Sequence, residues 1–122
     1  MSAGKILLID DEIEIRGFLQ NFFEENEYDV LVANNGEEGW EKFQQGSYDL
    51  VVCDMMMPKM LGIEVLRRIR EKVPTQKVIM LTGVKEQTMV DKAKALGCKF
   101  YLNKPFSLKD LGERVEECFK EK

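Results

Sequence analysis

The most informative absence in this 122-residue chain is histidine, which does not occur at all. Without it the chain cannot form a nucleophilic triad with a histidine base, use a histidine general base, or build a zinc site from cysteine and histidine ligands. These classes of catalytic and metal site are therefore excluded.

Cysteine is scarce and irregularly spaced. The chain has three cysteines, Cys53, Cys98 and Cys118, an odd number with no CxxC pair. We interpret them as reduced thiols that serve as small buried hydrophobes in a cytoplasmic protein.

Long apolar runs and an excess of basic residues are also missing. No run approaches the ~20 apolar residues of a membrane-spanning helix, and the first residues lack the apolar segment of a signal peptide. The net charge is -4, whereas a nucleic-acid-binding domain needs a basic face. We therefore expect no direct contact with membrane or nucleic acid.

What the sequence does contain is a regular alternation of two kinds of segment. Short apolar runs, several of them β-branched, are typical of strands buried on both faces of a sheet, and an amphipathic stretch follows each one. The five runs are residues 5–9, 29–33, 50–53, 77–81 and 100–102. The pattern predicts one α/β domain over residues 1–122, a flavodoxin-like (βα)5 fold. Its five-stranded parallel sheet would have the order 2-1-3-4-5, with helices on both faces.

Apolar stripes and turn residues place the helices between these runs. The spacing predicts that the first helix buries Ile15, Phe18, Leu19 and Phe22, and that the last buries Leu108, Leu111, Val115 and Cys118. Asn35-Gly36 is typical of a helix start, and so is Ser107 with Asp110 three residues later.

Polar residues follow the predicted strands at one edge of the sheet. In open parallel sheets, ligands bind beyond the carboxyl ends of the strands where the strand order reverses, here between the first and third strands. The residues that leave the strands at this edge are Asp10, Asp11, Glu12, Asp54, Thr82, Lys104 and Pro105.

This combination of residues favours phosphoryl transfer. Carboxylates gathered in one pocket repel each other and need a cation, and Mg²⁺ suits them because it binds one or two carboxylates together with phosphoryl oxygen. Lys104 adds a positive charge and Thr82 adds a hydroxyl donor. The nucleophile would be the carboxylate of Asp54, and the product would be an aspartyl phosphate.

Taken one at a time, the same residues have simpler interpretations. The acidic run at residues 10–12 could be a helix N-terminus favoured by the helix dipole. Asp54 alone could be a turn residue, and Thr82 alone could be the end of a strand. Their convergence from four predicted strands on one edge favours a common site.

Four stretches of the sequence resemble the receiver domain of bacterial two-component response regulators. They are ILLIDDE, DLVVCDMMMPKMLGIEVL, VIMLTG and FYLNKPF, and the similarity spans residues 5–119. The resemblance implies a phosphorylation-dependent signalling switch rather than an enzyme. Asp54 would accept a phosphoryl group from a sensor histidine kinase or a histidine phosphotransfer protein.

The resemblance also implies a set of metal ligands. Asp11 and Asp54 would bind Mg²⁺ directly, Met56 would bind it through the backbone carbonyl, and Asp10 would bind it through a water molecule. The domain would then assist its own Mg²⁺-dependent phosphorylation and dephosphorylation.

Further roles follow from the resemblance for residues of the fourth and fifth strands. Lys104 and Thr82 would hold the phosphoryl oxygens, Tyr101 would be the switch aromatic, and the Lys104–Pro105 peptide bond would be cis. The fourth helix, fifth strand and fifth helix would form the surface that changes and that an output domain or protein recognises.

The sequence departs from the family pattern in the third loop and the fifth strand. Leu61 precedes Gly62 where the family often has an aspartate, and Asn103 stands where a smaller or β-branched residue is common.

Met56 and Val84 are apolar at positions where a polar side chain could hold the hydrolytic water. We therefore predict a long-lived phosphorylated state.

Three other functions would use a similar fold. A dehalogenase-type phosphatase is expected to carry its nucleophile in a D-x-D motif after the first strand, whereas this strand ends in Asp10-Asp11. A flavodoxin-like FMN carrier needs a Ser/Thr/Gly-rich phosphate loop there, which these acidic residues would oppose. An interaction module that is never phosphorylated would be expected to lack part of the acidic set, which is complete.

Overall fold

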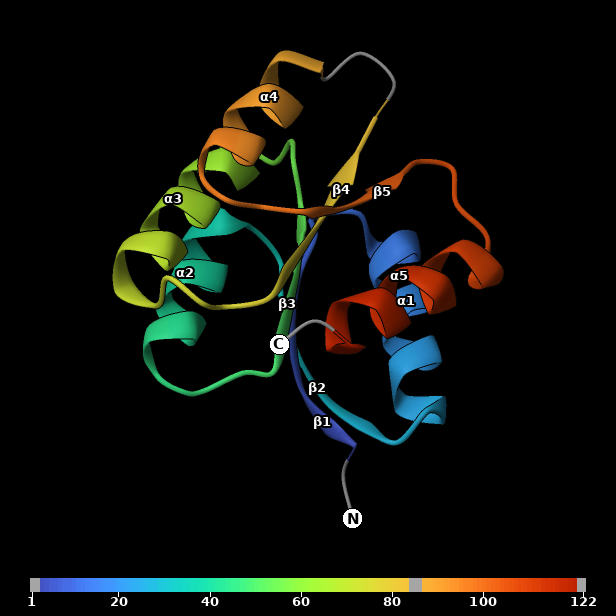
Figure 1. Ribbon diagram of the computed structural model, residues 1–122. Coiled ribbons are helices and arrows are strands. Elements are labelled where there is room, and N and C mark those ends of the chain that lie inside the picture. Colours follow the sequence, from blue (N-terminus) through green and yellow to red (C-terminus); the bar gives the residue numbers. More distant parts are fainter. Residues whose placement is uncertain (1–2, 84–86, 121–122) are drawn as a thin grey trace.

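The computed structural model describes residues 3–83 and 87–120, and in this part of the chain five strands alternate with five helices (Figure 1). The elements are β1 (Gly4–Ile9), α1 (Ile13–Glu25), β2 (Tyr28–Ala33), α2 (Gly36–Gln44), β3 (Leu50–Asp54), α3 (Gly62–Lys72), β4 (Val78–Thr82), α4 (Gln87–Ala95), β5 (Phe100–Asn103) and α5 (Leu108–Lys120). The predicted strands are confirmed, and their bounds differ by about one residue.

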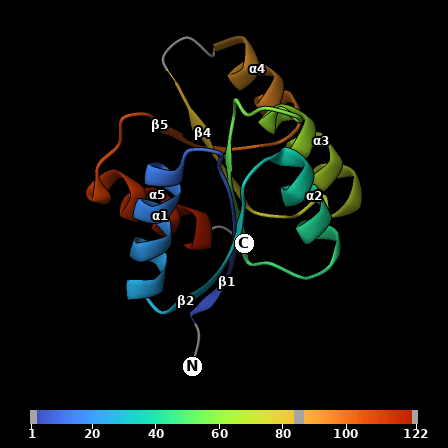
Figure 2. The same cartoon turned by 180° about the vertical axis from the view of Figure 1, so that it is seen from behind.

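The strands form one parallel sheet with the predicted order β2-β1-β3-β4-β5. Helices α1 and α5 cover one face, and α2, α3 and α4 cover the other; the view from behind shows the same three layers (Figures 1 and 2). In the β1–β3 register Ile9 lies opposite Cys53. The residues that follow them, Asp10 and Asp54, therefore leave the sheet side by side.

Successive residues of each inner strand contribute to opposite cores, because side chains alternate across a sheet. In β3, Leu50 and Val52 pack with residues of α1 and α5, whereas Val51 and Cys53 pack with residues of α2, α3 and α4. All five residues of β3 are buried. This two-sided burial explains why the inner strands are near-continuous apolar runs.

The predicted apolar stripe of α1 is wrong in part. Leu19 and Phe23 are fully buried at i, i+4 spacing, whereas Phe18 is 39% exposed and contacts the Phe106 ring at a centroid distance of 6.0 Å. Leu108 was also expected in the core, but as the first residue of α5 it is 54% exposed. The rest of the α5 stripe is buried as predicted. All three cysteines are buried.

Both predicted helix starts are confirmed. The Asn35 side chain accepts a hydrogen bond from the Glu38 N–H at 2.9 Å. At α5, the Asp110 N–H donates to Ser107 Oγ and the Ser107 N–H donates to the Asp110 carboxylate, both at 3.1 Å. This reciprocal pair satisfies backbone donors that have no partner inside the helix.

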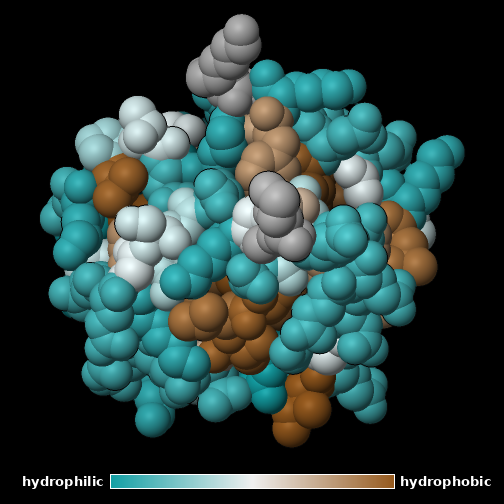
Figure 3. Space-filling model, turned by 90° about the horizontal axis from the view of Figure 1, so that it is seen from below, coloured by the Kyte–Doolittle hydropathy of each residue, from teal (hydrophilic) through white to brown (hydrophobic). Residues whose placement is uncertain are grey.

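The helices of the described residues are all too short or too polar to cross a membrane. The face seen from below is mostly hydrophilic, with apolar side chains gathered in a patch below the centre of the view (Figure 3). Apolar surface on this face is therefore local and forms no continuous belt.

Candidate functional site

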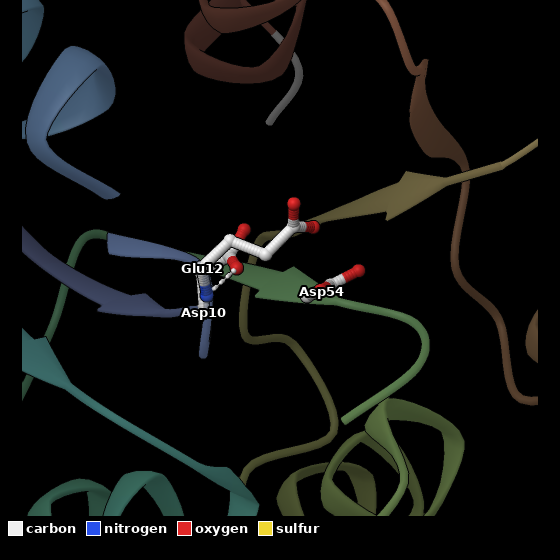
Figure 4. Close-up of side chains that lie close together, drawn as sticks. All are labelled: Asp10, Glu12 and Asp54. Carbon is white, nitrogen blue, oxygen red and sulfur yellow. Dashed lines mark hydrogen bonds between the residues drawn. The ribbon is translucent and has the colours of Figure 1, made fainter. Parts of the chain in front are cut away.

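Two almost buried carboxylates lie together where β1 and β3 end. Asp10 is 0% exposed and Asp54 is 3% exposed. One carboxylate oxygen from each of Asp10, Glu12 and Asp54 lies within 4.8 Å of the others (Figure 4). Three negative charges at this separation repel one another strongly, so the site is suited to a cation.

Asp10 is the most constrained member of this group. Its Oδ1 accepts a hydrogen bond from the Glu12 N–H at 2.8 Å, and its backbone carbonyl accepts one from Arg16 at 3.1 Å. Its Oδ2 is buried and has no hydrogen-bond partner among the described residues. Burial raises the pKa of Asp10, and the charges of Glu12 and Asp11 add to this, against the Glu12 N–H and Lys104.

This buried oxygen is the best test of whether a metal fits. An unpaired buried carboxylate oxygen is costly, and a hard cation such as Mg²⁺ binds carboxylate oxygens in this way. The donor atoms here are all oxygens, and the described residues of the group include no thiolate. The site therefore fits a hard divalent cation.

Asp54 combines burial with both a like and an opposite charge. Burial, followed by repulsion from Asp10, raises the pKa of Asp54 from 3.8 to about 6. Hydrogen bonds from Lys104 and from the Met56 N–H act in the other direction. At neutral pH the Asp54 carboxylate is therefore ionised, and Lys104 and the Met56 N–H balance only part of its negative charge.

Lys104 supplies the positive charge of the site. Its Nζ lies 2.8 Å from Glu12 Oε1 and 3.0 Å from Asp54 Oδ1. Burial alone would lower the pKa of Lys104, but hydrogen bonds to these two carboxylates outweigh it, so the pKa is raised and the ammonium stays charged. The Lys104 N–H also donates to the Thr82 carbonyl at 2.7 Å, and the Lys104–Pro105 bond is cis as predicted.

The loop between β3 and α3 folds back on Asp54. The Met55 N–H donates to the Leu81 carbonyl, and the Gly62 N–H donates to the Met55 carbonyl, both at 2.9 Å. A Cβ on Gly62 would lie 2.1 Å from the Asp54 carbonyl oxygen, so only glycine permits this approach. The loop therefore fixes the backbone of Asp54. The side chain of Met56, in the same loop, is 45% exposed.

Two further polar side chains of β4 and β5 make hydrogen bonds away from Asp54. The buried Thr82 hydroxyl donates to Asn103 Oδ1 at 3.0 Å. The Tyr101 hydroxyl donates to the Cys98 carbonyl at 2.8 Å, and its ring packs against the core beneath α3 and α4. Val84 lies outside the described residues.

Residues 6–116 match the family described as the response regulator receiver domain. The chain belongs to this family. The predicted receiver fold and the resemblance noted in the sequence are therefore both confirmed.

Curated relatives of this receiver domain are transcriptional regulators. It is 38% identical to the alkaline phosphatase synthesis transcriptional regulatory protein PhoP of Bacillus subtilis and 41% identical to the transcriptional regulatory protein ResD of the same organism. Each match covers 92% of this chain but only 47% and 46% of the relative. The receiver domain thus spans about half the length of these relatives.

Solved receiver domains have the same fold over nearly the full length of this chain. A receiver domain protein of Clostridium thermocellum is 34% identical, with a TM-score of 0.89 over 98% of this chain and 95% of that one. A CheY-like receiver domain protein of Methanospirillum hungatei is 29% identical, with a TM-score of 0.93 over 98% and 96%.

The structure brings most, but not all, of the predicted receiver site together. Asp10, Asp54 and Lys104 meet as expected, whereas the third carboxylate beside them is Glu12, and Asp11 is half-buried outside this group. The sequence places Glu12 at the right edge but gives it no role. Its contact with Lys104 joins residues 92 positions apart in the sequence, so local patterns could not predict it. The sequence shows only that a glutamate, with its long side chain, stands just before α1.

Proposed function

We propose that this receiver domain, over residues 1–122, is a phosphorylation-dependent switch with Asp54 as the acceptor. A carboxylate oxygen of Asp54 would form a bond to phosphorus as the N–P bond of a donor phosphohistidine breaks. The donor would be a sensor histidine kinase or a histidine phosphotransfer protein. The observation that supports this most strongly is the buried Asp54 carboxylate held 3.0 Å from Lys104 Nζ.

The residues around Asp54 have complementary roles in this proposal. Asp10, Asp11, Asp54 and the carbonyl of Met56 would hold Mg²⁺, which when bound neutralises charge on phosphoryl oxygens. The Lys104 ammonium binds a phosphoryl oxygen directly, since charge-assisted hydrogen bonds of this kind are strong. The loop tied down at Gly62 keeps Asp54 fixed for in-line attack.

The response to phosphorylation would pass through Thr82 and Tyr101. In our proposal the Thr82 hydroxyl turns to the phosphoryl group, and Tyr101 turns inward behind it. Tyr101 would then lose its hydrogen bond to the Cys98 carbonyl. The surface of α4, β5 and α5 changes as a result.

The partner that recognises this surface would be an output domain or a separate output protein. The transcriptional regulators among the relatives are about twice as long as this chain, which supports an output domain in those proteins. An odd number of cysteines, all of them buried, favours a cytoplasmic location for the exchange.

Phosphorylation by acetyl phosphate tests this function. We expect the unmodified protein to gain the mass of one phosphoryl group only when Mg²⁺ is present. Asp54→Asn should gain none, while Asp29→Asn, which changes an exposed aspartate, should behave like the unmodified protein. Equal labelling of all three proteins would rule out Asp54 as the acceptor.

A further inference from the structure

The ends of β4 and β5 place an unusual pair of polar residues next to each other. Strands β4 and β5 are neighbours in the sheet (Figure 1). In their register Thr82 lies opposite Asn103. Thr82 is buried, whereas Asn103 is exposed, and both line a groove that also includes Gln87 and Tyr101. The pair therefore lies at the carboxyl end of the sheet, in the groove beside α4.

The hydrogen bond of this pair uses the only proton that the Thr82 hydroxyl can donate. The Thr82 Oγ1 lies 3.0 Å from its acceptor Asn103 Oδ1, and a second acceptor, the Gly83 carbonyl oxygen, is farther away at 3.4 Å. A hydroxyl donates one hydrogen bond. While it donates to Asn103, it cannot donate to a phosphoryl oxygen on Asp54.

The backbone keeps this arrangement in place. The Lys104 N–H donates to the Thr82 carbonyl at 2.7 Å, so the two strand ends cannot slide past each other. The hydroxyl changes its acceptor by rotation of its O–H bond or of the whole Thr82 side chain, and either movement breaks the hydrogen bond to Asn103. A small or apolar β-branched side chain at position 103 would offer the hydroxyl no acceptor.

We propose that Asn103 is a positioning residue that holds the Thr82 hydroxyl in the resting orientation and so opposes phosphorylation. This inference rests on the proposed function of Asp54 and Thr82. Because Asn103 is exposed, its amide oxygen passes to water when the hydroxyl leaves. The preference of the Thr82 hydroxyl for its resting orientation is therefore worth one neutral hydrogen bond. This corresponds to about threefold to tenfold in the equilibrium constant between the two orientations.

The test is a double-mutant cycle on the affinity for beryllofluoride, a phosphoryl mimic, with Mg²⁺ present. Asn103→Val removes the acceptor and suits a strand end. We expect it to tighten binding by about threefold to tenfold, and to speed labelling by acetyl phosphate in the same proportion. Asn103→Asp keeps an acceptor at the same atom and should give no tightening. In a Thr82→Val background, which lacks the hydroxyl, Asn103→Val should have no effect.

A second measurement needs no phosphoryl group. The side-chain rotamer of Thr82, followed by NMR couplings to its methyl group, should be single in the unmodified protein and mixed in Asn103→Val. Urea unfolding checks that the variants are folded, and Asn103→Ala replaces Asn103→Val if the latter is not.

The outcomes separate this inference from the function on which it rests. Unchanged affinity in Asn103→Val, tightening in Asn103→Asp, or the same tightening in the Thr82→Val background would overturn the role of Asn103. An unmodified protein that takes up neither beryllofluoride nor phosphoryl would overturn the proposed function itself.

Discussion

The buried charge of Asp54 should destabilise the metal-free protein at neutral pH. Its carboxylate is almost inaccessible, and its negative charge is repelled by Asp10 and only partly balanced by Lys104. Asp54→Asn removes this charge while keeping the shape of the side chain. We therefore expect the substitution to make the metal-free protein more stable, although it destroys the proposed acceptor.

The pKa of Asp54 sets the size of the effect. A pKa raised from 3.8 to about 6 corresponds to an upper limit of about 3 kcal/mol for ionising this group in the folded protein. The amide of Asp54→Asn accepts a weaker hydrogen bond from Lys104 than a carboxylate does. We therefore expect a net gain of about 1–2 kcal/mol in the free energy of unfolding at pH 8.

The direction of the pH dependence follows from the raised pKa. The folded protein holds the Asp54 proton more tightly than the unfolded chain does, so protonated Asp54 contributes to the stability of the folded state. This contribution is complete below about pH 4 and is lost as the pH rises through about 6. The advantage of Asp54→Asn should consequently fall by about 1.4 kcal/mol between pH 8 and pH 5, from about 1–2 kcal/mol to near zero. Urea unfolding with EDTA measures this, with Asp29→Asn as the control for an exposed aspartate.

Added Mg²⁺ should reduce the stability advantage of Asp54→Asn in the same assay. A ligand that binds only the folded protein stabilises it, so Mg²⁺ should raise the stability of the unmodified protein more than that of Asp54→Asn. An Asp54→Asn variant that is less stable than the unmodified protein in EDTA at pH 8, or whose advantage is the same at pH 5 and pH 8, would refute this reasoning.

Three further predictions concern the backbone, the metal and the lifetime of the phosphorylated state. Gly17→Ala should raise the free energy of unfolding by about 1 kcal/mol, because its Cβ would meet nothing within 4 Å in α1; Gly62→Ala should lower it, because its Cβ would meet the Asp54 carbonyl at 2.1 Å. Urea midpoints that change in the same direction would contradict this pair. Asp11→Ala should weaken Mg²⁺ binding measured by calorimetry, and an unchanged affinity would exclude Asp11 as a ligand. Met56→Asn should speed dephosphorylation, since an amide can hold the attacking water; an unchanged rate would show that this side chain does not set the lifetime.

The sheet was predictable because each inner strand is buried on both faces. Residues 50–53 are apolar without interruption, and the structure places Leu50 and Val52 in one core and Val51 and Cys53 in the other. The helix starts at Asn35 and Ser107 were predictable for a similar reason, since a cap depends on residues three positions apart.

The helix faces were less predictable because neighbouring elements decide them. The helical periodicity predicts that both Phe18 and Leu19 are buried in the core. In the structure Leu19 is fully buried, whereas Phe18 packs beside Phe106 at the surface. The details of the site depend on long-range contacts too. The contact of Lys104 with Glu12 joins residues far apart in the chain, and the Thr82–Asn103 hydrogen bond depends on the β4–β5 register.

The central claim is that Asp54 carries the phosphoryl group, and chemical trapping tests it most directly. After treatment with acetyl phosphate and Mg²⁺, borohydride reduction converts an acyl phosphate on aspartate into homoserine, which peptide mapping by mass spectrometry can locate. We expect homoserine at position 54 alone, and none when Mg²⁺ is withheld. Homoserine at position 10 or 11, or a phosphorylated protein in which position 54 is still aspartate after reduction, would contradict it.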